Sequence, residues 1–575
     1  MASTPDRHRP WGLPLGMRPH GLVLAAGLVA AFVLLPVVAL VGIAMRGSGD
    51  LWPHLIAYVL PDALIQTAIL LVGVGVLSVA TAVPCAWLVA TCDFPGRRMF
   101  DWALLLPLAV PGYIVAYSYL DILHPLGPVQ SAIRWMLGIS SPRGLRLPDL
   151  RSAGGCIFVL SCVLYPYVYL SARASFVMQS AAVLEVARTL GAGPWRSVLR
   201  IALPLARPAI VVGMTLALLE VLGDIGASEF LGMRTLTVSI YATWVNRSNL
   251  PGAAQIALVM LVVVLAMIAL ERTARQRARY VGTGSPRPRA AFPLTGIAAS
   301  AAVAACTIPL LLGFIVPVLH LSLAALHRIG THGLPSSIFL EARNSAVLAA
   351  GGTVLALALG MVVAVATRLS RGALVPAFAR LAELGYAVPG TVLAIGLLTP
   401  LAGFDNHVNA LMQRLTGTSS GLILSGTGVA LVIAYAIRFL AIPIGTLESG
   451  YARMSSHLDM AARNLGCGRR GVVARVHMPL LRPAAATAAL MVFVDGMKEL
   501  PATLLLRPLG VETLATHIYA QAARGTYEDG ALAALAIILV GLGPVLLLAR
   551  LSRSQERPVH ASDASRQQVS ASANP

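Results

Sequence analysis

Long, continuously apolar segments limit this 575-residue chain to a helical membrane fold. Only 12% of its residues are charged, whereas a soluble protein carries about 25%. About 20 apolar residues span a bilayer as a helix, and a transmembrane barrel would alternate polar and apolar residues instead. We therefore expect an all-α polytopic membrane protein with about 12 transmembrane helices. The spans are predicted at 21–45, 63–92, 101–123, 153–176, 207–231, 254–271, 294–326, 343–367, 378–402, 421–446, 484–506 and 531–550.

The positions of the basic residues predict how the chain crosses the membrane. The segment 21–45 follows a basic start and is too long for the apolar core of a signal peptide, so it is predicted to remain as the first span. Arginines concentrate in alternate loops, which predicts a bacterial inner-membrane protein with both termini in the cytoplasm. One loop departs from this pattern, since 124–152 is basic but is predicted to lie outside. The net charge of +19 thus reflects topology and not nucleic-acid binding.

The chain reads as two tandem halves of six spans each. The motif Val110-Pro111-Gly112 recurs as Val388-Pro389-Gly390. Both copies fall inside spans, where proline and glycine break the helical hydrogen-bond ladder, so each predicts a kink that either lines the path or serves packing alone. Because six is even, both halves enter the membrane the same way, which predicts a pseudo-two-fold axis along the membrane normal and a pathway between the halves. The other predicted parts are the N-terminus plus first span at 1–59, a basic cytoplasmic linker at 272–293, the seventh span and an outside loop at 294–339, and a disordered tail at 551–575.

A polar, basic loop occurs twice between apolar segments, at 185–204 and at 460–479. Helix formers precede Gly191 and Gly466, and a second short run follows each glycine. Glycine takes the left-handed conformation that ends or bends a helix, so each loop is predicted to form two short helices joined at a bend. One copy alone would indicate an amphipathic hairpin at the membrane surface. Two copies in matching register indicate two docking points for a partner.

The spacing within these loops resembles the coupling loop of ABC importer permeases with the type I transmembrane fold. The resemblance covers 60–271 and 340–550, which become the first and second predicted permease domains. In the second copy Met460 stands where the first has Glu185, and Asp459 lies one place earlier. The residues that the resemblance assigns to ATPase coupling are Glu185, Ala187, Gly191, Pro204, Ala461, Ala462, Gly466 and Pro479.

Within that family the chain is most similar to the fused permeases of ferric-iron importers. The stretches 93–98, 107–112 and 495–508 carry this likeness. It implies a permease that works with two copies of an ABC ATPase and an external, periplasmic substrate-binding protein. Lys498 is the only lysine and is followed by Glu499, so the chain lacks the Gly-Lys-Ser/Thr of a Walker phosphate loop. ATP is therefore expected in the partner ATPase, with no cofactor and no catalytic residue in this chain.

Charged residues inside the predicted spans mark a candidate translocation path. Glu220 and Asp224 lie four residues apart in the fifth span, and Asp495 and Glu499 repeat that spacing in the eleventh, so each pair is expected to share one helix face. A charge at mid-bilayer costs about 2.5–3.5 kcal/mol on insertion scales, so these groups are expected to face protein or water. They form either an acidic lining suited to a hard cation or internal ion pairs that fix helix packing. The candidate path residues are Glu220, Asp224, Asp495, Glu499, Arg438, Lys498, Pro111 and Pro389, with Glu229 as a possible addition.

Other functions remain open at this stage. The six cysteines show no metal-ligand spacing, so no metal site is expected. Related permeases carry thiamine, phosphonates, polyamines or sulfate instead of iron. A proton-coupled secondary transporter is also built from parallel six-helix halves, and it would use the buried acids as a proton relay without any ATPase. An intramembrane enzyme finds no support, because the histidines are dispersed near loops.

Overall fold

The computed structural model describes residues 19–141, 143–145, 147–179, 197–276, 292–370 and 372–555. Within these ranges nine helices are long and apolar enough to cross a membrane, and three further pairs of bent helices raise the number of spans to as many as 12. The predicted all-α polytopic fold is therefore confirmed. The one strand pairing in this part of the chain is short and parallel, between β1 (Cys92–Asp93) and β2 (Phe292–Pro293).

The elements fall into two successive groups, one for each half of the chain. The first half contains α1 (Pro19–Met45), α2 (Leu51–His54), η1 (Leu55–Val59), α3 (Leu60–Thr91), α4 (Arg97–Ala103), η2 (Leu106–Ala109), α5 (Gly112–Ile122), α6 (Pro128–Met136), α7 (Ala153–Met178), η3 (Val198–Ala202), α10 (Leu203–Gly223), α11 (Gly226–Phe230), α12 (Leu236–Val245) and α13 (Leu250–Gln276). The second contains α14 (Gly296–Leu310), η4 (Leu311–Ile315), α15 (Val316–His332), α16 (Ser337–Leu369), α17 (Leu374–Glu383), η5 (Leu384–Ala387), α18 (Gly390–Thr416), α19 (Val429–Phe439), α20 (Ala441–Ala452), α21 (Ser456–Asn464), α22 (Arg469–Val472), η6 (Val473–His477), α23 (Met478–Met497), α24 (Pro501–Leu506), α25 (Leu514–Arg524) and α26 (Tyr527–Gln555).

Three predicted spans are broken, two of them at the Pro-Gly motifs. The span at 101–123 bends by 89° between η2 and α5, and the span at 378–402 bends by 110° between η5 and α18. The span at 421–446 bends by 46° between α19 and α20. In the first two, a Pro-Gly pair follows an extended valine, and proline cannot continue the hydrogen-bond ladder of the preceding turn. Apolar composition alone does not reveal such breaks.

The spans that carry the predicted acids also end earlier than expected. Asp224 is the residue after α10 and has an extended ψ of 125°, and Glu499 lies beyond the end of α23 at Met497. The prediction that each acidic pair shares one helix face is therefore wrong. In both halves the first acid lies on the helix, and the second lies in the turn that follows it.

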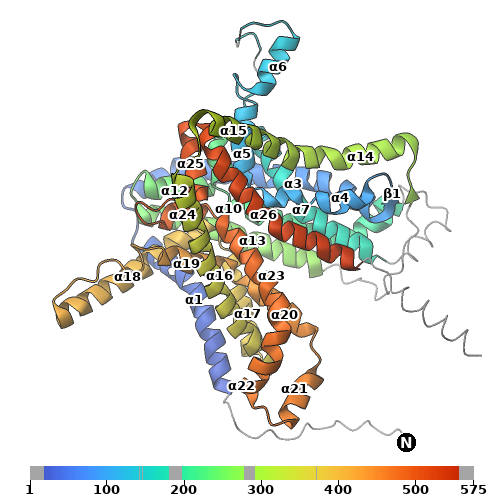
Figure 1. Cartoon of the computed structure of the whole chain (residues 1–575). Helices are drawn as coiled ribbons and strands as arrows, with labels where there is room; N and C mark the ends of the chain where they lie inside the picture. The colour runs from blue at the N-terminus through green and yellow to red at the C-terminus, as the bar shows by residue number, and fades with distance from the viewer. Residues whose placement is uncertain are drawn as a thin grey trace, which may run out of the picture.

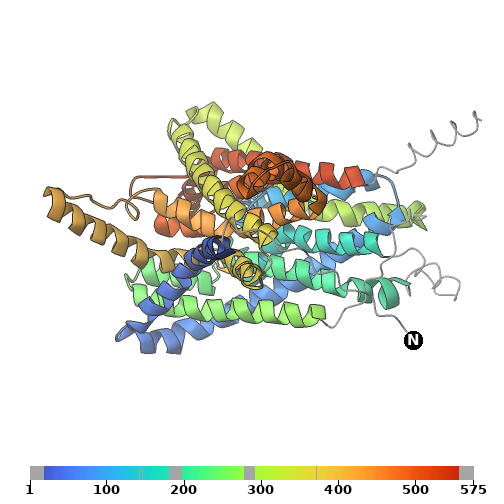
Figure 2. The same ribbon diagram turned by 90° about the horizontal axis from the view of Figure 1, so that it is seen from below.

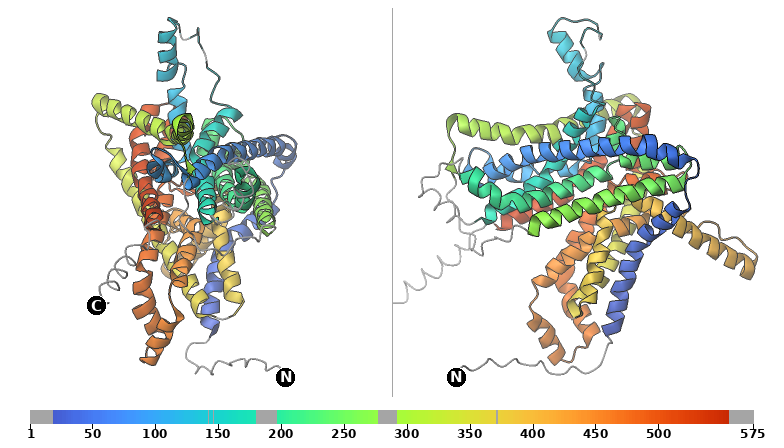
Figure 3. Two further views of the ribbon diagram at one scale, coloured as in Figure 1. Left: turned by 90° about the vertical axis from the view of Figure 1, so that its right-hand side faces the viewer. Right: turned by 180° about the vertical axis from the view of Figure 1, so that it is seen from behind.

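The first spans of the two halves are exchanged. Helix α1 packs against α16, α17 and α18 of the second half, while α14, η4 and α15 contact α3, α7 and α5 of the first. Backbones approach closely at these crossings, since a Cβ on Gly396 would lie 2.3 Å from the carbonyl oxygen of Pro36, and one on Gly313 would lie 2.3 Å from that of Cys162. The two bundles cross and interlock in Figures 1 and 2, and Figure 3 shows α6 standing out from the bundle.

Four π-helical turns share one cause. The turns η1, η3, η4 and η6 each lead into an α-helix whose second residue is proline. These prolines are Pro61, Pro204, Pro317 and Pro479. A proline inside a helix lacks an N–H and its ring collides with the carbonyl four residues earlier, and a wider π-turn relieves that collision. The turns η3 and η6 follow the two repeated loops, so matching bends join each loop to α10 or α23.

Candidate functional site: a charged cavity between the halves

A cavity of about 130 Å³ lies where the broken spans of both halves meet. This volume suffices for a few water molecules, each of which takes about 30 Å³ in the liquid. The cavity is lined by α7, α10 and the η2–α5 bend of the first half and by the η5–α18 bend, α19 and the α23–α24 turn of the second. All eight candidate path residues line it, namely Pro111, Glu220, Asp224, Pro389, Arg438, Asp495, Lys498 and Glu499.

The two proline bends have the same geometry. Pro111 and Pro389 both show φ of −58° and ψ of 146°, and each precedes the first residue of a helix, α5 or α18. The following residues, Gly112 and Gly390, leave the room that the cavity needs. A Cβ on Gly390 would come within 2.6 Å of Glu499 Oε1 and 2.7 Å of Arg438 Nη1. The glycine therefore lets the second-half charges approach the start of α18.

The acids of the second half lie beside cations. Lys498 Nζ lies 2.8 Å from Asp495 Oδ1, and Arg438 Nε lies 3.9 Å from Glu499 Oε1. Glu499 also accepts hydrogen bonds from the backbone N–H groups of Ala502 at 3.1 Å and Thr503 at 3.2 Å, at the start of α24. Because this carboxylate is only 5% exposed, it is held by both a cation and a helix N-terminus.

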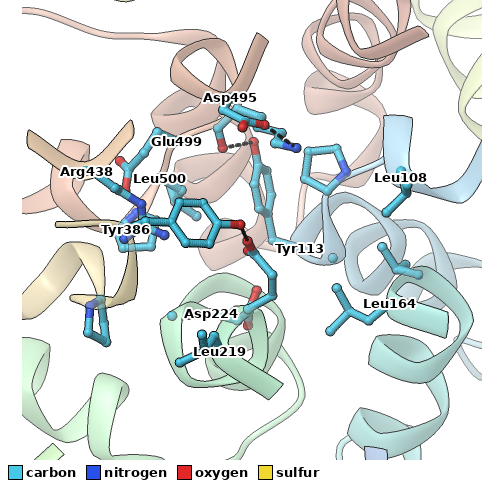
Figure 4. A pocket seen from close by; sticks show the side chains of 18 of the residues that line it. Leu108, Tyr113, Leu164, Leu219, Asp224, Tyr386, Arg438, Asp495, Glu499 and Leu500 are labelled. Atoms are coloured by element: carbon cyan, nitrogen blue, oxygen red, sulfur yellow. Dashed lines mark hydrogen bonds and ion pairs between the residues drawn. The ribbon is translucent and has the colours of Figure 1, made fainter. Parts of the chain in front are cut away.

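The acids of the first half have different partners. Glu220 Oε1 accepts a hydrogen bond of 3.1 Å from the hydroxyl of Tyr386, and Asp224 Oδ1 accepts one of 2.9 Å from the N–H of Ser228. In the described ranges neither carboxylate forms an ion pair with a lysine, arginine or histidine. Figure 4 shows Tyr113 and Tyr386 between Asp224 and the acids of the second half. The cavity therefore combines a neutralised wall and an acidic wall.

Sequence reasoning missed the tyrosines. Tyr113, Tyr167 and Tyr386 line the cavity, and the Tyr113 hydroxyl donates to the carbonyl oxygen of Lys498 at 3.4 Å. The signal available in the sequence was weak, because a tyrosine in an apolar span is common in any helix core. Glu229 lies apart from this lining and accepts a 2.6 Å hydrogen bond from Tyr519 on α25. Among the residues described, no group of three His, Cys, Asp or Glu side chains could hold a metal ion.

The second repeated loop forms the predicted helix and bend. It consists of α21, a bend at Gly466 with φ of +83°, and the short helix α22. Ala461 is exposed and Ala462 is buried. Pro479 and Pro204 are the second residues of α23 and α10. Glu185, Ala187 and Gly191 of the first loop lie outside the described residues.

Two groups of membrane-spanning helices meet at a small charged cavity. Residues 82–280 and 356–557 both match the family described as "Binding-protein-dependent transport system inner membrane component". The chain belongs to this family and carries its domain twice, which confirms the predicted resemblance to ABC permeases. Members of the family are transport permeases, not enzymes, and work with an ATPase and a substrate-binding protein.

The relatives differ in their cargo. The chain is 24% identical to the Fe(3+)-transport system permease protein FbpB 2 of Haemophilus influenzae, over 85% of this chain and 89% of the relative. It is 30% identical to the molybdenum transport system permease protein ModB of Escherichia coli, over 38% of this chain and 99% of the relative. It is 27% identical to a putative 2-aminoethylphosphonate transport system permease protein of Salmonella paratyphi A, over 32% of this chain and 64% of the relative.

Proposed function

We propose that this permease imports ferric iron. The observation that carries the proposal is the charge of the cavity, whose lining holds four carboxylates and two cations. Both cations lie against second-half carboxylates, which leaves Glu220 and Asp224 as the acidic wall. Hard cations prefer oxygen ligands such as carboxylates. An oxyanion would meet this wall with like charge in a confined space of low dielectric, where repulsion is strong.

The relatives support the same cargo. FbpB 2, whose name gives Fe(3+), matches 85% of the chain, whereas ModB matches 38%. The charge of the cavity argues against molybdate, sulfate and phosphonate. Thiamine and polyamines are cations and would meet the same acidic wall, so direct competition must separate them from iron. The absence of a three-ligand metal cluster in the described residues suits transit, because tight ligation would slow release.

The proposed assembly follows from the family. An external binding protein delivers the ion, and two copies of the ATPase dock at the loops 185–204 and 460–479 on the cytoplasmic side of the inner membrane. Both termini lie in the cytoplasm. ATP binds to the partner subunits, so the permease itself needs no cofactor. The structural basis for docking is the second loop, which exposes Leu458 and Met460 on α21 and Leu465 directly after it.

The test is transport by the complete complex in proteoliposomes. Permease, ATPase and binding protein are reconstituted, and uptake of radioactive ferric iron is followed with ATP inside the vesicles. We expect ATP-dependent uptake that excess molybdate, sulfate, 2-aminoethylphosphonate, thiamine or spermidine leaves unchanged. Uptake of one of these competitors in place of iron would refute the cargo. Uptake that continues without ATP and stops when a proton gradient is dissipated would refute the ABC mechanism.

A further inference from the structure

A buried polar cluster connects α21, the helix of the second repeated loop, to the transmembrane helices. Asp459 on α21 places Oδ1 2.8 Å from Nε2 of His477 and Oδ2 3.4 Å from Nη2 of Arg368. Nδ1 of His477 lies 3.3 Å from the hydroxyl of Tyr451, and the guanidinium of Arg368 lies 5.8 Å from the centre of the Tyr451 ring. One carboxylate on the loop therefore joins the ends of α16, α20 and η6.

The side chains of this cluster are largely shielded from solvent. His477 is fully buried, and the side chains of Asp459 and Arg368 are 17% and 20% exposed. Buried polar groups are costly unless they are hydrogen-bonded, and removing one partner leaves the others unsatisfied. The cluster thus has one favourable arrangement, with α21 against the bundle.

The first half has no counterpart in sequence. Ala202 ends the π-turn η3 where His477 ends η6, since each lies two residues before the proline of its loop. Leu184 stands seven residues before Gly191, as Asp459 stands seven residues before Gly466. The acidic residue of the second loop is therefore shifted by one position from that of the first, and it faces the bundle.

Other side chains of this loop are exposed and accessible to a partner. On α21, Leu458 is 44% exposed and Met460 50%, and Leu465, directly after the helix, is 85% exposed. Asp459 thus contacts the transmembrane helices, while the apolar side chains of Leu458 and Met460 are exposed to solvent. Separate faces allow docking and anchoring at the same time.

The helix α23 connects the cluster to the cavity. α23 starts directly after His477 and ends at Met497, just past Asp495 of the cavity lining. Twenty residues of helix span roughly 30 Å. A displacement of α21 would therefore pass through His477 to α23, and along α23 to the cavity residue Asp495.

We propose that Asp459 and His477 are positioning residues that transmit movement of the second coupling helix to the cavity, with Arg368 as an additional anchor. The inference rests on the proposed docking of an ATPase at this loop. It assigns the acid of the second loop to the permease bundle and not to the ATPase surface. The histidine of this connection belongs to the second loop, because Ala202 stands at the equivalent position of the first.

The experiment compares Asp459→Asn, His477→Gln and Arg368→Gln in the reconstituted complex. The readouts are the amount of ATPase that copurifies, the rate of ATP hydrolysis and the iron taken up per ATP hydrolysed. We expect D459N and H477Q to retain the ATPase and hydrolysis within about twofold, while uptake per ATP falls at least fivefold. R368Q should show a smaller loss. The matched control is H320Q, which removes another His–Asp pair, His320 with Asp121 at 2.9 Å, that is distant in sequence from the loop.

Two results would overturn the proposal. If D459N loses the ATPase while H477Q keeps both the ATPase and normal uptake per ATP, Asp459 contacts the ATPase directly. If H320Q lowers uptake per ATP as much as H477Q, the effect is general destabilisation. Should D459N fail to fold, H477Q decides, and unchanged uptake per ATP in that variant refutes the tie. A wild-type complex that never retains an ATPase would instead refute the proposed function.

Discussion

Single residues divide the cavity into two walls with different tasks. Glu499 is held by Arg438 and by backbone N–H groups of α24, so its negative charge is already satisfied by the protein. Glu220 accepts a hydrogen bond from the hydroxyl of Tyr386 and forms no ion pair within the described ranges. Carboxylates of equal formal charge therefore differ in what they can offer to a passing ion.

Neutralising Glu220 should affect transport, whereas neutralising Glu499 should affect stability. We expect Glu220→Gln to lower ferric uptake at least tenfold with no change in thermal stability, because the hydrogen bond from Tyr386 can persist. Glu499→Gln should lower stability by roughly 1–3 kcal/mol, since it leaves buried partners poorly satisfied. Uptake in proteoliposomes and thermal unfolding in detergent measure both. Full uptake by E220Q would show that the acidic wall does not contact the ion.

At the scale of elements, prolines set the bends that connect loops to spans. Each π-turn precedes a proline at the second position of an α-helix, and two of the four join the coupling loops to α10 and α23. The proline that closes each repeated loop therefore has a structural role that its spacing alone did not explain. It fixes a π-turn at the entry of the following helix.

Removing one such proline should disturb coupling. In Pro479→Ala the ring no longer collides with the preceding turn, so η6 is expected to relax to a regular α-helix and rotate the residues before it, His477 included. We expect uptake per ATP to fall several-fold. Pro317→Ala changes the same motif at the entry of α15 and serves as the control. Equal losses in the two variants would assign the effect to helix stability in general.

The sequence predicted the positions of the membrane spans better than it predicted the geometry of the bends within them. Long apolar runs located the membrane spans, and recurrence of Pro-Gly placed a bend in each half. The sizes of these bends, 89° and 110°, could not be read from the sequence. The four acids that the sequence singled out, because charge in an apolar span is costly, line the cavity. Their partners could not be predicted, since the pairing of Arg438 with Glu499 depends on how distant spans pack.

The whole molecule is held together by exchange of its first spans. Helix α1 precedes the first half in sequence but packs against α16, α17 and α18 of the second. Several of its small residues are buried there, including Ala26 and Ala30. The halves are thus interlocked over much of their length and not merely joined by the linker.

Deleting the first span should therefore damage the opposite half. A chain that starts at residue 50 would expose the surface of α18 around Gly396, where α1 approaches most closely. We expect this truncated chain to aggregate or to elute as a broadened peak in size-exclusion chromatography. Supplying residues 1–49 as a separate polypeptide should restore part of the monodisperse peak. A truncated chain that remains monodisperse and active would show that the exchanged span is dispensable.

Covalent fusion of two interlocked halves has a consequence for how such a protein can change. Two identical subunits would have to keep the same side chain at both equivalent positions, so any cation introduced to neutralise one acid would neutralise its twin. A single chain is free of this constraint. It can fix Arg438 and Lys498 beside one pair of acids and leave Tyr386 beside the other. Joining the halves thus permits division of labour across an otherwise repeated architecture.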